Sequence, residues 1–195
     1  TDPQIYASIH DCLAFLATES NDANAYLEWA LKVGATNYQT MELLDKAHTE
    51  TYGHPEPTQV RITPVKGKCI LVSGHALNDL EDILKQTADK GINVYTHGEL
   101  LPALAYPKFK QYPHLVGNYG GAWQDQQAEF AAFPGSIVMT TNCLIQPQNS
   151  YNQRLFTTHA VGWAGIPHIE NHDYTPVIKA ALTAPGFAND ADEAK

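Results

Sequence analysis

The sequence has few basic residues, and they form no cluster. Its 195 residues carry a formal net charge of −9, and the 12 lysines and arginines are scattered, with no run of three. A surface of this kind offers no footprint for a phosphate backbone. Nucleic acid is therefore not an expected partner.

Long apolar runs and cysteines are also scarce. No window approaches the roughly 18 consecutive apolar residues of a membrane span, and the N-terminus lacks a signal-peptide pattern, so we expect a soluble, cytoplasmic protein without membrane contact. The three cysteines, Cys12, Cys69 and Cys143, are too few for a disulfide-stapled domain, and we expect them to be reduced.

Nucleotide-binding motifs are missing as well. No Gly-x-x-x-x-Gly-Lys-Ser/Thr occurs, and the glycines of the segment 117–124 lack the spacing of a dinucleotide fingerprint. This segment could present backbone N–H groups to an anion or form a tight turn into a helix. The spacing favours the turn, with a nucleotide-binding doubly wound domain as an alternative.

The first part of the chain has helical periodicity. Apolar residues recur at helical spacing from Ile5 to about Ala17, and a second helix is expected from about Asp22 to Val33, with Gly34 as its C-cap. A third helix is expected over about Thr36–Glu50, before the prolines of 53–58 end the pattern. We assign residues 1–58 to a helical arm.

From Lys68 the pattern changes to short β-rich runs separated by helical segments. Strands are expected at Cys69–Val72, Ile92–Tyr95, Leu115–Val116, Ile137–Met139, Leu155–Phe156 and Ile166–Ile169, and helices at Asn78–Lys90, Ala122–Phe133 and Thr175–Leu182, with a helical turn after Glu99. This alternation predicts an α/β fold, a Rossmann-like parallel sheet flanked by helices, over residues 59–187. A polar tail, 188–195, follows. The chain opens without a methionine and closes on this polar tail, so we expect a fragment or an excised domain of a longer protein.

Three predicted strands are followed by residues that can bind metals. Ser73-Gly74-His75 follows the first strand, Thr96-His97-Gly98-Glu99 the second, and Thr140-Thr141-Asn142-Cys143 the fourth. Because ligands bind at the carboxyl ends of parallel strands, an imidazole, a carboxylate and a thiolate are expected at one sheet edge. Such a mixed set can hold a transition metal or a metal cluster.

Each of these residues also has a structural interpretation. His75 could be a capping or packing residue, Glu99 could favour a helix N-terminus, and Cys143 could be a small buried hydrophobe. His97 could be a hydrogen-bonding partner of Glu99. We interpret Cys12 and Cys69 as structural. Hydrolase chemistry at Ser73 and His75 is disfavoured, because neighbouring loop residues rarely align as a nucleophile and its base.

Several strings of the sequence resemble the hybrid cluster proteins, also called prismane proteins or hydroxylamine reductases, in order and spacing. The strings are Ile70-Leu-Val-Ser-Gly-His75, Asn93-Val-Tyr-Thr-His-Gly-Glu99-Leu-Leu-Pro-Ala, His114-Leu-Val-Gly-Asn-Tyr-Gly-Gly-Ala-Trp-Gln124, Phe133-Pro-Gly-Ser-Ile-Val-Met-Thr-Thr-Asn-Cys143, Phe156-Thr-Thr and Val161-Gly-Trp-Ala-Gly-Ile-Pro-His-Ile169. The resemblance covers about Lys66 to Phe187, and the helical arm resembles the end of the family's N-terminal helical domain.

This resemblance implies an oxidoreductase with two metal centres, an iron–sulfur cubane and a hybrid iron–sulfur–oxygen cluster at the junction of its domains. Members of the family reduce hydroxylamine to ammonia and are linked to nitric oxide reduction under nitrosative stress, with electrons from a redox donor. By motif, His75, Glu99 and Cys143 match ligands of the hybrid cluster. Glu99 or His97 could deliver a proton.

The sequence also departs from the family pattern. The N-terminal cysteine cluster has no counterpart, and no cysteine follows Cys143, although the family's next domain supplies further cysteines and a glutamate. We therefore expect only part of the cluster site here, with the remaining domains of the parent protein as partners, no cubane and no activity for the chain alone. A cofactor-free scaffold is the remaining alternative.

Overall fold

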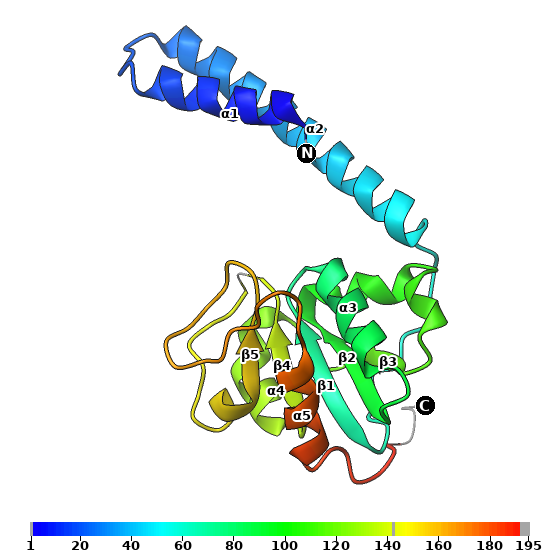
Figure 1. The fold of residues 1–195 in the computed structure, drawn as a ribbon. Helices are drawn as coiled ribbons and strands as arrows, with labels where there is room; N and C mark the ends of the chain where they lie inside the picture. Colours follow the sequence, from blue (N-terminus) through cyan, green and yellow to red (C-terminus); the bar gives the residue numbers. More distant parts are fainter. Residues whose placement is uncertain (1, 142, 192–195) are drawn as a thin grey trace. The chain divides into compact units, whose positions relative to one another are not determined.

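The protein forms two compact units in a computed structural model, which describes residues 2–141 and 143–191. The chain divides between His54 and Pro55. The first unit is helical and the second contains a sheet (Figure 1). Each unit is built on its own set of apolar contacts.

The helical unit consists of α1 (Pro3–Leu16) and α2 (Ala23–Tyr52). Both helices begin at an aspartate whose side chain accepts a hydrogen bond from the backbone two residues later, which satisfies one of the free N–H groups of the first turn. The helices are held together by Phe15 of α1. Its ring stacks on Trp29 at 5.3 Å and meets Tyr26 edge-on at 5.1 Å.

The expected break at Gly34 is wrong, because α2 is one continuous helix of 30 residues where two helices were predicted. Glycine costs about 1 kcal/mol relative to alanine in a helix interior, but it keeps its N–H and C=O groups. Nearby residues with high helix propensity, Leu31, Lys32 and Ala35, offset that cost. The helix ends at Gly53, whose φ is 87° and whose N–H donates to the carbonyl of Thr49.

Helix length alone does not make α2 a membrane segment. Within the described ranges, no helix is both long enough and apolar enough to span a bilayer.

The second unit is built on a five-stranded sheet in the order β3-β2-β1-β4-β5, with every pair parallel. The strands are β1 (Lys68–Ser73), β2 (Ile92–His97), β3 (Leu115–Asn118), β4 (Ser136–Met139) and β5 (Leu155–Thr157). The helices are α3 (Leu77–Thr87), η1 (Gly98–Ala105), η2 (Phe109–Gln111), η3 (Trp123–Asp125), α4 (Gln126–Ala132), η4 (Asn152–Arg154) and α5 (Thr175–Thr183), where η denotes a 3-10 helix. The predicted α/β fold is confirmed.

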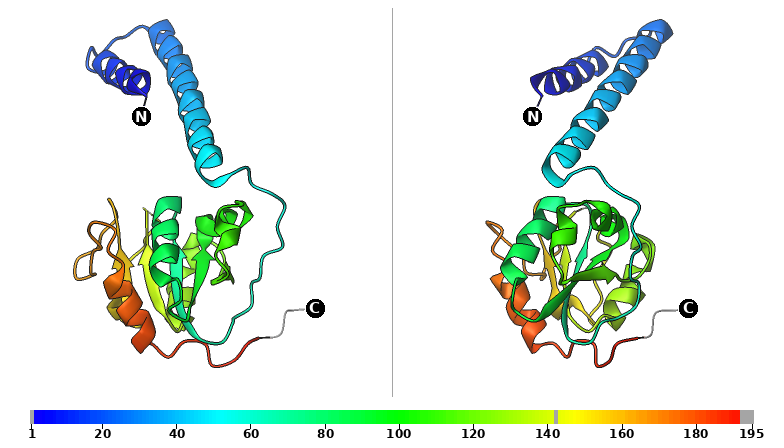
Figure 2. Two further views of the ribbon diagram at one scale, coloured as in Figure 1. Left: turned by 45° about the vertical axis from the view of Figure 1, so that its right-hand side comes forward. Right: turned by 90° about the vertical axis from the view of Figure 1, so that its right-hand side faces the viewer.

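Helices cover both faces of the sheet, with α3 and α5 on one face and α4 on the other (Figure 2). This arrangement explains the unbroken apolar run of β1, because a strand covered on both sides has no solvent-facing residues. Cys69 and Leu71 of β1 pack in one cluster with Phe130 and Phe133, which lie on and just after α4. All four side chains are fully buried.

The strand expected at Ile166–Ile169 is not formed. Only a single parallel bridge joins Thr157 of β5 to His168. Pro167 has no N–H group and therefore cannot donate to a ladder, although its carbonyl accepts from Thr157. This segment lies along the edge of the sheet without extending it.

A substitution at Gly135 tests the packing of this sheet. A Cβ there would overlap the carbonyl oxygen of Cys69 and lie 2.8 Å from its sulfur atom. We expect Gly135→Ala to lower the free energy of unfolding by about 1–3 kcal/mol or more, as overpacking does. Denaturant unfolding followed by circular dichroism measures the change.

The matched control is Gly162→Ala, because a Cβ at Gly162 meets nothing within 4 Å. Its effect should lie within about 0.5 kcal/mol of zero. Equal stability of the two variants would contradict the packing described for β1.

Candidate functional site

Three loops meet at the carboxyl edge of the sheet, where the strand order reverses. The chain moves outward from β1 through β2 to β3 and then returns to β4 on the other side of β1. Loops leaving β1 and β4 therefore diverge, which opens a crevice at this edge. His75 follows β1 and Cys143 follows β4, while Glu99 lies in the first turn of η1, directly after β2.

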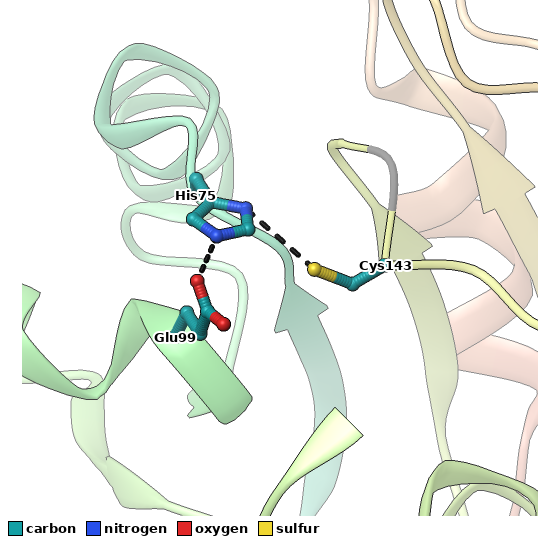
Figure 3. A group of neighbouring side chains, drawn as sticks. All are labelled: His75, Glu99 and Cys143. Carbon is teal, nitrogen blue, oxygen red and sulfur yellow. Dashed lines mark hydrogen bonds and ion pairs between the residues drawn. The ribbon is translucent and has the colours of Figure 1, made fainter. Parts of the chain in front are cut away.

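The structure brings the three predicted ligands together (Figure 3). The Nε2 atom of His75 contacts the Oε2 atom of Glu99, and its Nδ1 atom lies 3.8 Å from the sulfur of Cys143. One ligand atom from each residue lies within 4.8 Å of the others. The Oγ1 atom of Thr141 lies 2.7 Å from the same Nδ1 atom and fixes the orientation of the ring.

The local backbone explains why His75 reaches this position. Gly74 has a φ of 110°, and a Cβ there would overlap the hydroxyl oxygen of Thr140 and lie 2.6 Å from that of Thr141. Only glycine fits this close approach without strain. Thr140 then holds the loop by donating from its N–H and its hydroxyl to the carbonyl of Ser73, at 2.9 and 3.0 Å.

The site is open to solvent on one side. The side chains of His75 and Glu99 are 42% and 54% exposed, whereas Cys143 is half-buried. Burial, with a smaller contribution from the negative charge of Glu99, raises the pKa of the Cys143 thiol above its usual range. The thiol is therefore neutral near pH 7 until a metal ion displaces its proton.

The donor chemistry fits a mixed iron–sulfur–oxygen group. A thiolate favours soft iron, an imidazole suits iron generally, and a carboxylate suits a harder, oxygen-bridged ion. All three donor types converge here within the reach of one metal group. His75, Glu99 and Cys143 could hold one side of such a group, but three donors cannot saturate several iron ions.

His97 lies apart from this exposed set. It is fully buried, with its Nδ1 atom 2.8 Å from the hydroxyl of Ser73 and its Nε2 atom 2.7 Å from a carboxylate oxygen of Glu129. The partnership with Glu99 considered from the sequence is replaced by these two contacts. His97 therefore connects the end of β1 to α4.

The same glutamate accounts for the glycine-rich segment after β3. The N–H of Gly121 donates to the other carboxylate oxygen of Glu129 at 2.7 Å. That amide is thus paired within the protein, and this favours the tight turn over an anion site. No sequence signal marked Glu129, because its role depends on a loop and a helix folding onto one another.

A second set of donors, Asp79, His159 and His172, was also missed by the sequence analysis. His159 follows the end of β5, so its place at the carboxyl edge was a usable signal. His172 lies in the long loop before α5 and is not directly after a strand, which left no comparable signal.

Comparison with protein families gives one match over nearly the whole chain. The model described as the Prismane/CO dehydrogenase family matches residues 1–194. Hydroxylamine reductases are among the similar curated proteins. Those of Acidithiobacillus ferrooxidans (strain ATCC 53993 / BNL-5-31) and Acidithiobacillus ferridurans are 58% and 57% identical over 190 residues, 97% of this chain and 34% of each relative.

The hydroxylamine reductase of Burkholderia lata is 58% identical over 189 residues, again 97% of this chain and 34% of the relative. The chain therefore spans about a third of the length of these relatives.

Thiol reactivity tests the difference in burial between Cys69 and Cys143. Burial raises the pKa of Cys69 to about 12, so its reactive thiolate form is negligible at pH 8, whereas Cys143 is partly exposed. In a Cys12→Ala variant, we expect Ellman's reagent at pH 8 to modify one thiol in the native protein and a second only after addition of guanidinium.

A Cys12→Ala/Cys143→Ala double variant is the control and should show no accessible native thiol. Rapid modification of two thiols in the folded single variant would contradict the burial of Cys69.

Proposed function

Because the chain belongs to the prismane/CO dehydrogenase family, we propose that it forms one side of a hybrid iron–sulfur–oxygen cluster site in a larger hydroxylamine reductase. The observation that carries this proposal is the convergence of His75, Glu99 and Cys143 at one sheet edge. The relatives named hydroxylamine reductase support the reaction class.

When bound, the cluster would supply Lewis-acidic iron and two electrons for the conversion of hydroxylamine and two protons into ammonia and water. Nitric oxide is a second proposed substrate, consistent with a cytoplasmic role under nitrosative stress. The electrons would come from a redox donor through an iron–sulfur cubane held elsewhere in the parent protein.

The residues of this chain would place and orient the cluster. The Nδ1 atom of His75 is hydrogen-bonded to the hydroxyl of Thr141. The Nε2 atom of His75 and the adjacent carboxylate of Glu99 are therefore the pair that would bind iron. A hydrogen bond to the second ring nitrogen commonly fixes a metal-binding histidine in this way. Cys143 would add the thiolate, with loss of its proton on binding.

Glu99 is the better candidate for proton delivery. Its side chain is 54% exposed, so it can take a proton from solvent and carry it to the site. His97 is fully buried and hydrogen-bonded through both ring nitrogens. We assign His97 a positioning role, in which it holds the end of β1 against the middle of α4.

The remaining ligands would come from other domains of the parent protein. Three donors leave a multi-iron cluster open on its other sides, and the stability of such a cluster depends on a complete set of ligands. We therefore propose that this chain alone holds no complete cluster and has no reductase activity. Its essential partner is the rest of the parent protein.

The ligand assignment is tested in the full-length parent carrying Cys143→Ala, after anaerobic reconstitution. We expect iron per chain to fall and the electron paramagnetic resonance signal of the hybrid cluster to be lost, because the thiolate is removed. Circular dichroism and thermal unfolding check that the variant folds.

The matched control is Cys12→Ala in the same parent, since Cys12 lies on α1, outside the donor set. It should retain the iron content and the spectrum of the unmodified protein. A complete hybrid cluster in the Cys143→Ala parent would overturn the ligand assignment, and four irons bound by the 195-residue chain alone would overturn its incompleteness.

A further inference from the structure

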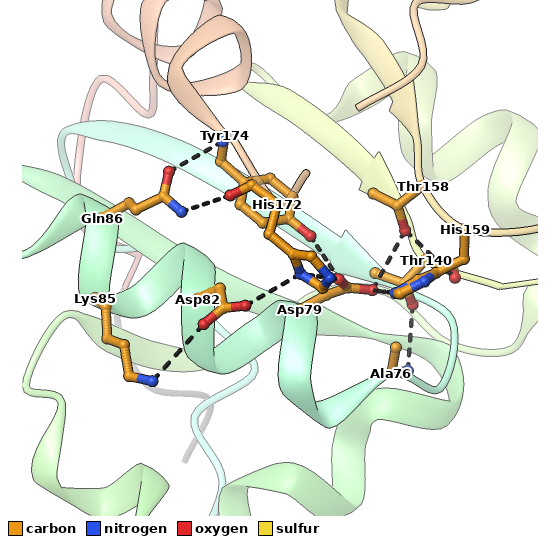
Figure 4. Close-up of polar contacts among 10 residues, drawn as sticks. All are labelled: Ala76, Asp79, Asp82, Lys85, Gln86, Thr140, Thr158, His159, His172 and Tyr174. Carbon is orange, nitrogen blue, oxygen red and sulfur yellow. Dashed lines mark hydrogen bonds and ion pairs between the residues drawn. The ribbon is translucent and has the colours of Figure 1, made fainter. Parts of the chain in front are cut away.

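A second group of metal-binding side chains lies at the carboxyl edge of the sheet and shares no residue with the first (Figure 4). The Nε2 atom of His159 lies 2.6 Å from one carboxylate oxygen of Asp79. The Nδ1 atom of His172 lies 3.4 Å from the other oxygen. Two imidazoles and one carboxylate thus face each other, with their donor atoms within 4.8 Å.

The three residues come from three separate segments. Asp79 lies in the first turn of α3, His159 lies two residues beyond the end of β5, and His172 lies in the loop that precedes α5. Because these segments are far apart in the sequence, the tertiary structure brings the three side chains together, and no local turn or helix does so. The same holds for most functional sites on open parallel sheets.

The backbone at both histidines is in the left-handed region. His159 has a φ of 52° and His172 a φ of 54°, and Asn171 beside it has a φ of 53°. Non-glycine residues in this conformation cost of order 1 kcal/mol each and persist where the surroundings enforce them. Here the strained conformation directs both imidazoles toward the same carboxylate.

Asp79 is held rigidly at the centre of the group. Its side chain is 1% exposed, and its Oδ1 atom accepts a hydrogen bond from the buried hydroxyl of Tyr174 at 2.6 Å. The hydroxyl of Thr158 donates to Oδ2 at 3.3 Å. Hydrogen bonds of this kind orient a carboxylate ligand and are typical of the layer that surrounds a metal site.

The loop that carries His172 is clamped to α3 by a single glutamine. The side-chain amide of Gln86 donates to the carbonyl of His172 at 2.7 Å, and its oxygen accepts from the N–H of Tyr174 at 3.0 Å. This pair of hydrogen bonds fixes the loop before any ligand arrives. A preorganised loop lowers the entropic cost of binding.

The burial of the Asp79 carboxylate also favours a cation beside it. A buried carboxylate is costly unless it is paired, and among the described residues its recorded ion pairs are with His159 and His172. These imidazoles are 39% and 44% exposed on a pocket of about 340 Å³. This hydrogen-bonded carboxylate and its two solvent-accessible imidazoles are able to accept a metal ion from solution.

We propose that Asp79, His159 and His172 bind one divalent first-row transition-metal ion, with water in the remaining positions. Two imidazole nitrogens and one carboxylate oxygen are the donor set of many zinc and non-haem iron(II) sites. Ligand bonds of about 2.0–2.2 Å would place the donor atoms about 3–3.5 Å apart. The Nε2 atom of His159 now lies 2.6 Å from Oδ2 of Asp79 and must move outward, whereas the Nδ1 atom of His172 lies 3.4 Å from Oδ1.

Three protein donors leave at least one coordination position directed into the pocket. Sites of this kind keep a water molecule that can exchange with another ligand. The Oδ2 atom of Asp82 lies 3.1 Å from the same Nδ1 atom of His172, a contact that a metal ion bound to Nδ1 would replace. The proposed ion is independent of the hybrid cluster, because neither donor set contains a residue of the other.

Zinc binding by the 195-residue chain tests the proposal. A His75→Ala/Cys143→Ala background removes competition from the first donor set. Isothermal titration with Zn²⁺ should then give one ion per chain, and thermal unfolding should shift to higher temperature when Zn²⁺ is added. Replacing either histidine, in His159→Gln or His172→Gln, should weaken binding by at least about tenfold and reduce the thermal shift.

The matched control is His168→Gln, because His168 lines the same pocket but its Nδ1 atom lies 3.0 Å from the hydroxyl of Thr157. Its zinc affinity should stay within about twofold of the background. Tyr174→Phe leaves the three donors in place and removes one hydrogen bond to Asp79, so we expect about tenfold weaker binding.

Two results would overturn the proposal. One is the absence of stoichiometric zinc binding in the folded background protein, which would leave the group as an ion-paired link between the loop and α3. The other is unchanged binding in both His159→Gln and His172→Gln, which would place the ion elsewhere. Circular dichroism of each variant separates loss of binding from loss of fold.

Discussion

The pairing of β1 with a parallel neighbour on each side is the constraint from which the site follows. In this register Ser73 pairs with His97 of β2 and with Met139 of β4. The three strands therefore end at the same level. The donors His75, Glu99 and Cys143 lie two to four residues beyond that level, close enough for their side chains to meet without a long loop.

The covering of the sheet by helices on both faces explains why its strands could be predicted from the sequence. Strands buried on both faces have unbroken apolar runs, and Cys69–Val72 of β1 and Ile137–Met139 of β4 are such runs. The first donor set was predictable for the same reason, because each donor closely follows a strand. The alternation of strands and helices predicted a parallel sheet, but the order of its strands came from the structure.

Other features depended on competition between weak local signals and tertiary contacts. Gly34 is a frequent helix terminator, but the cost of one glycine is too small to end a helix supported on both sides. The run Ile166–Ile169 has β propensity, but Pro167 cannot donate to a ladder. The partners of His97 could not be predicted, because Ser73 lies 24 residues before it and Glu129 lies 32 residues after it.

The two donor sets differ in chemistry although they share one sheet edge. The first contains a thiolate and suits a soft, sulfur-rich metal group, whereas the second contains only nitrogen and oxygen donors. Selectivity between metal ions thus has a basis in donor type as well as in position. The second set also has its carboxylate buried, so it depends more strongly on pairing with a cation.

Thr140 gives this edge of the sheet a common anchor. Its hydroxyl and N–H hold the loop that carries His75, and its carbonyl lies 3.5 Å from the hydroxyl of Thr158, which also contacts Asp79. Thr140 therefore makes hydrogen bonds toward the segments of both donor sets. The two sites thus share one structural threonine although they share no ligand.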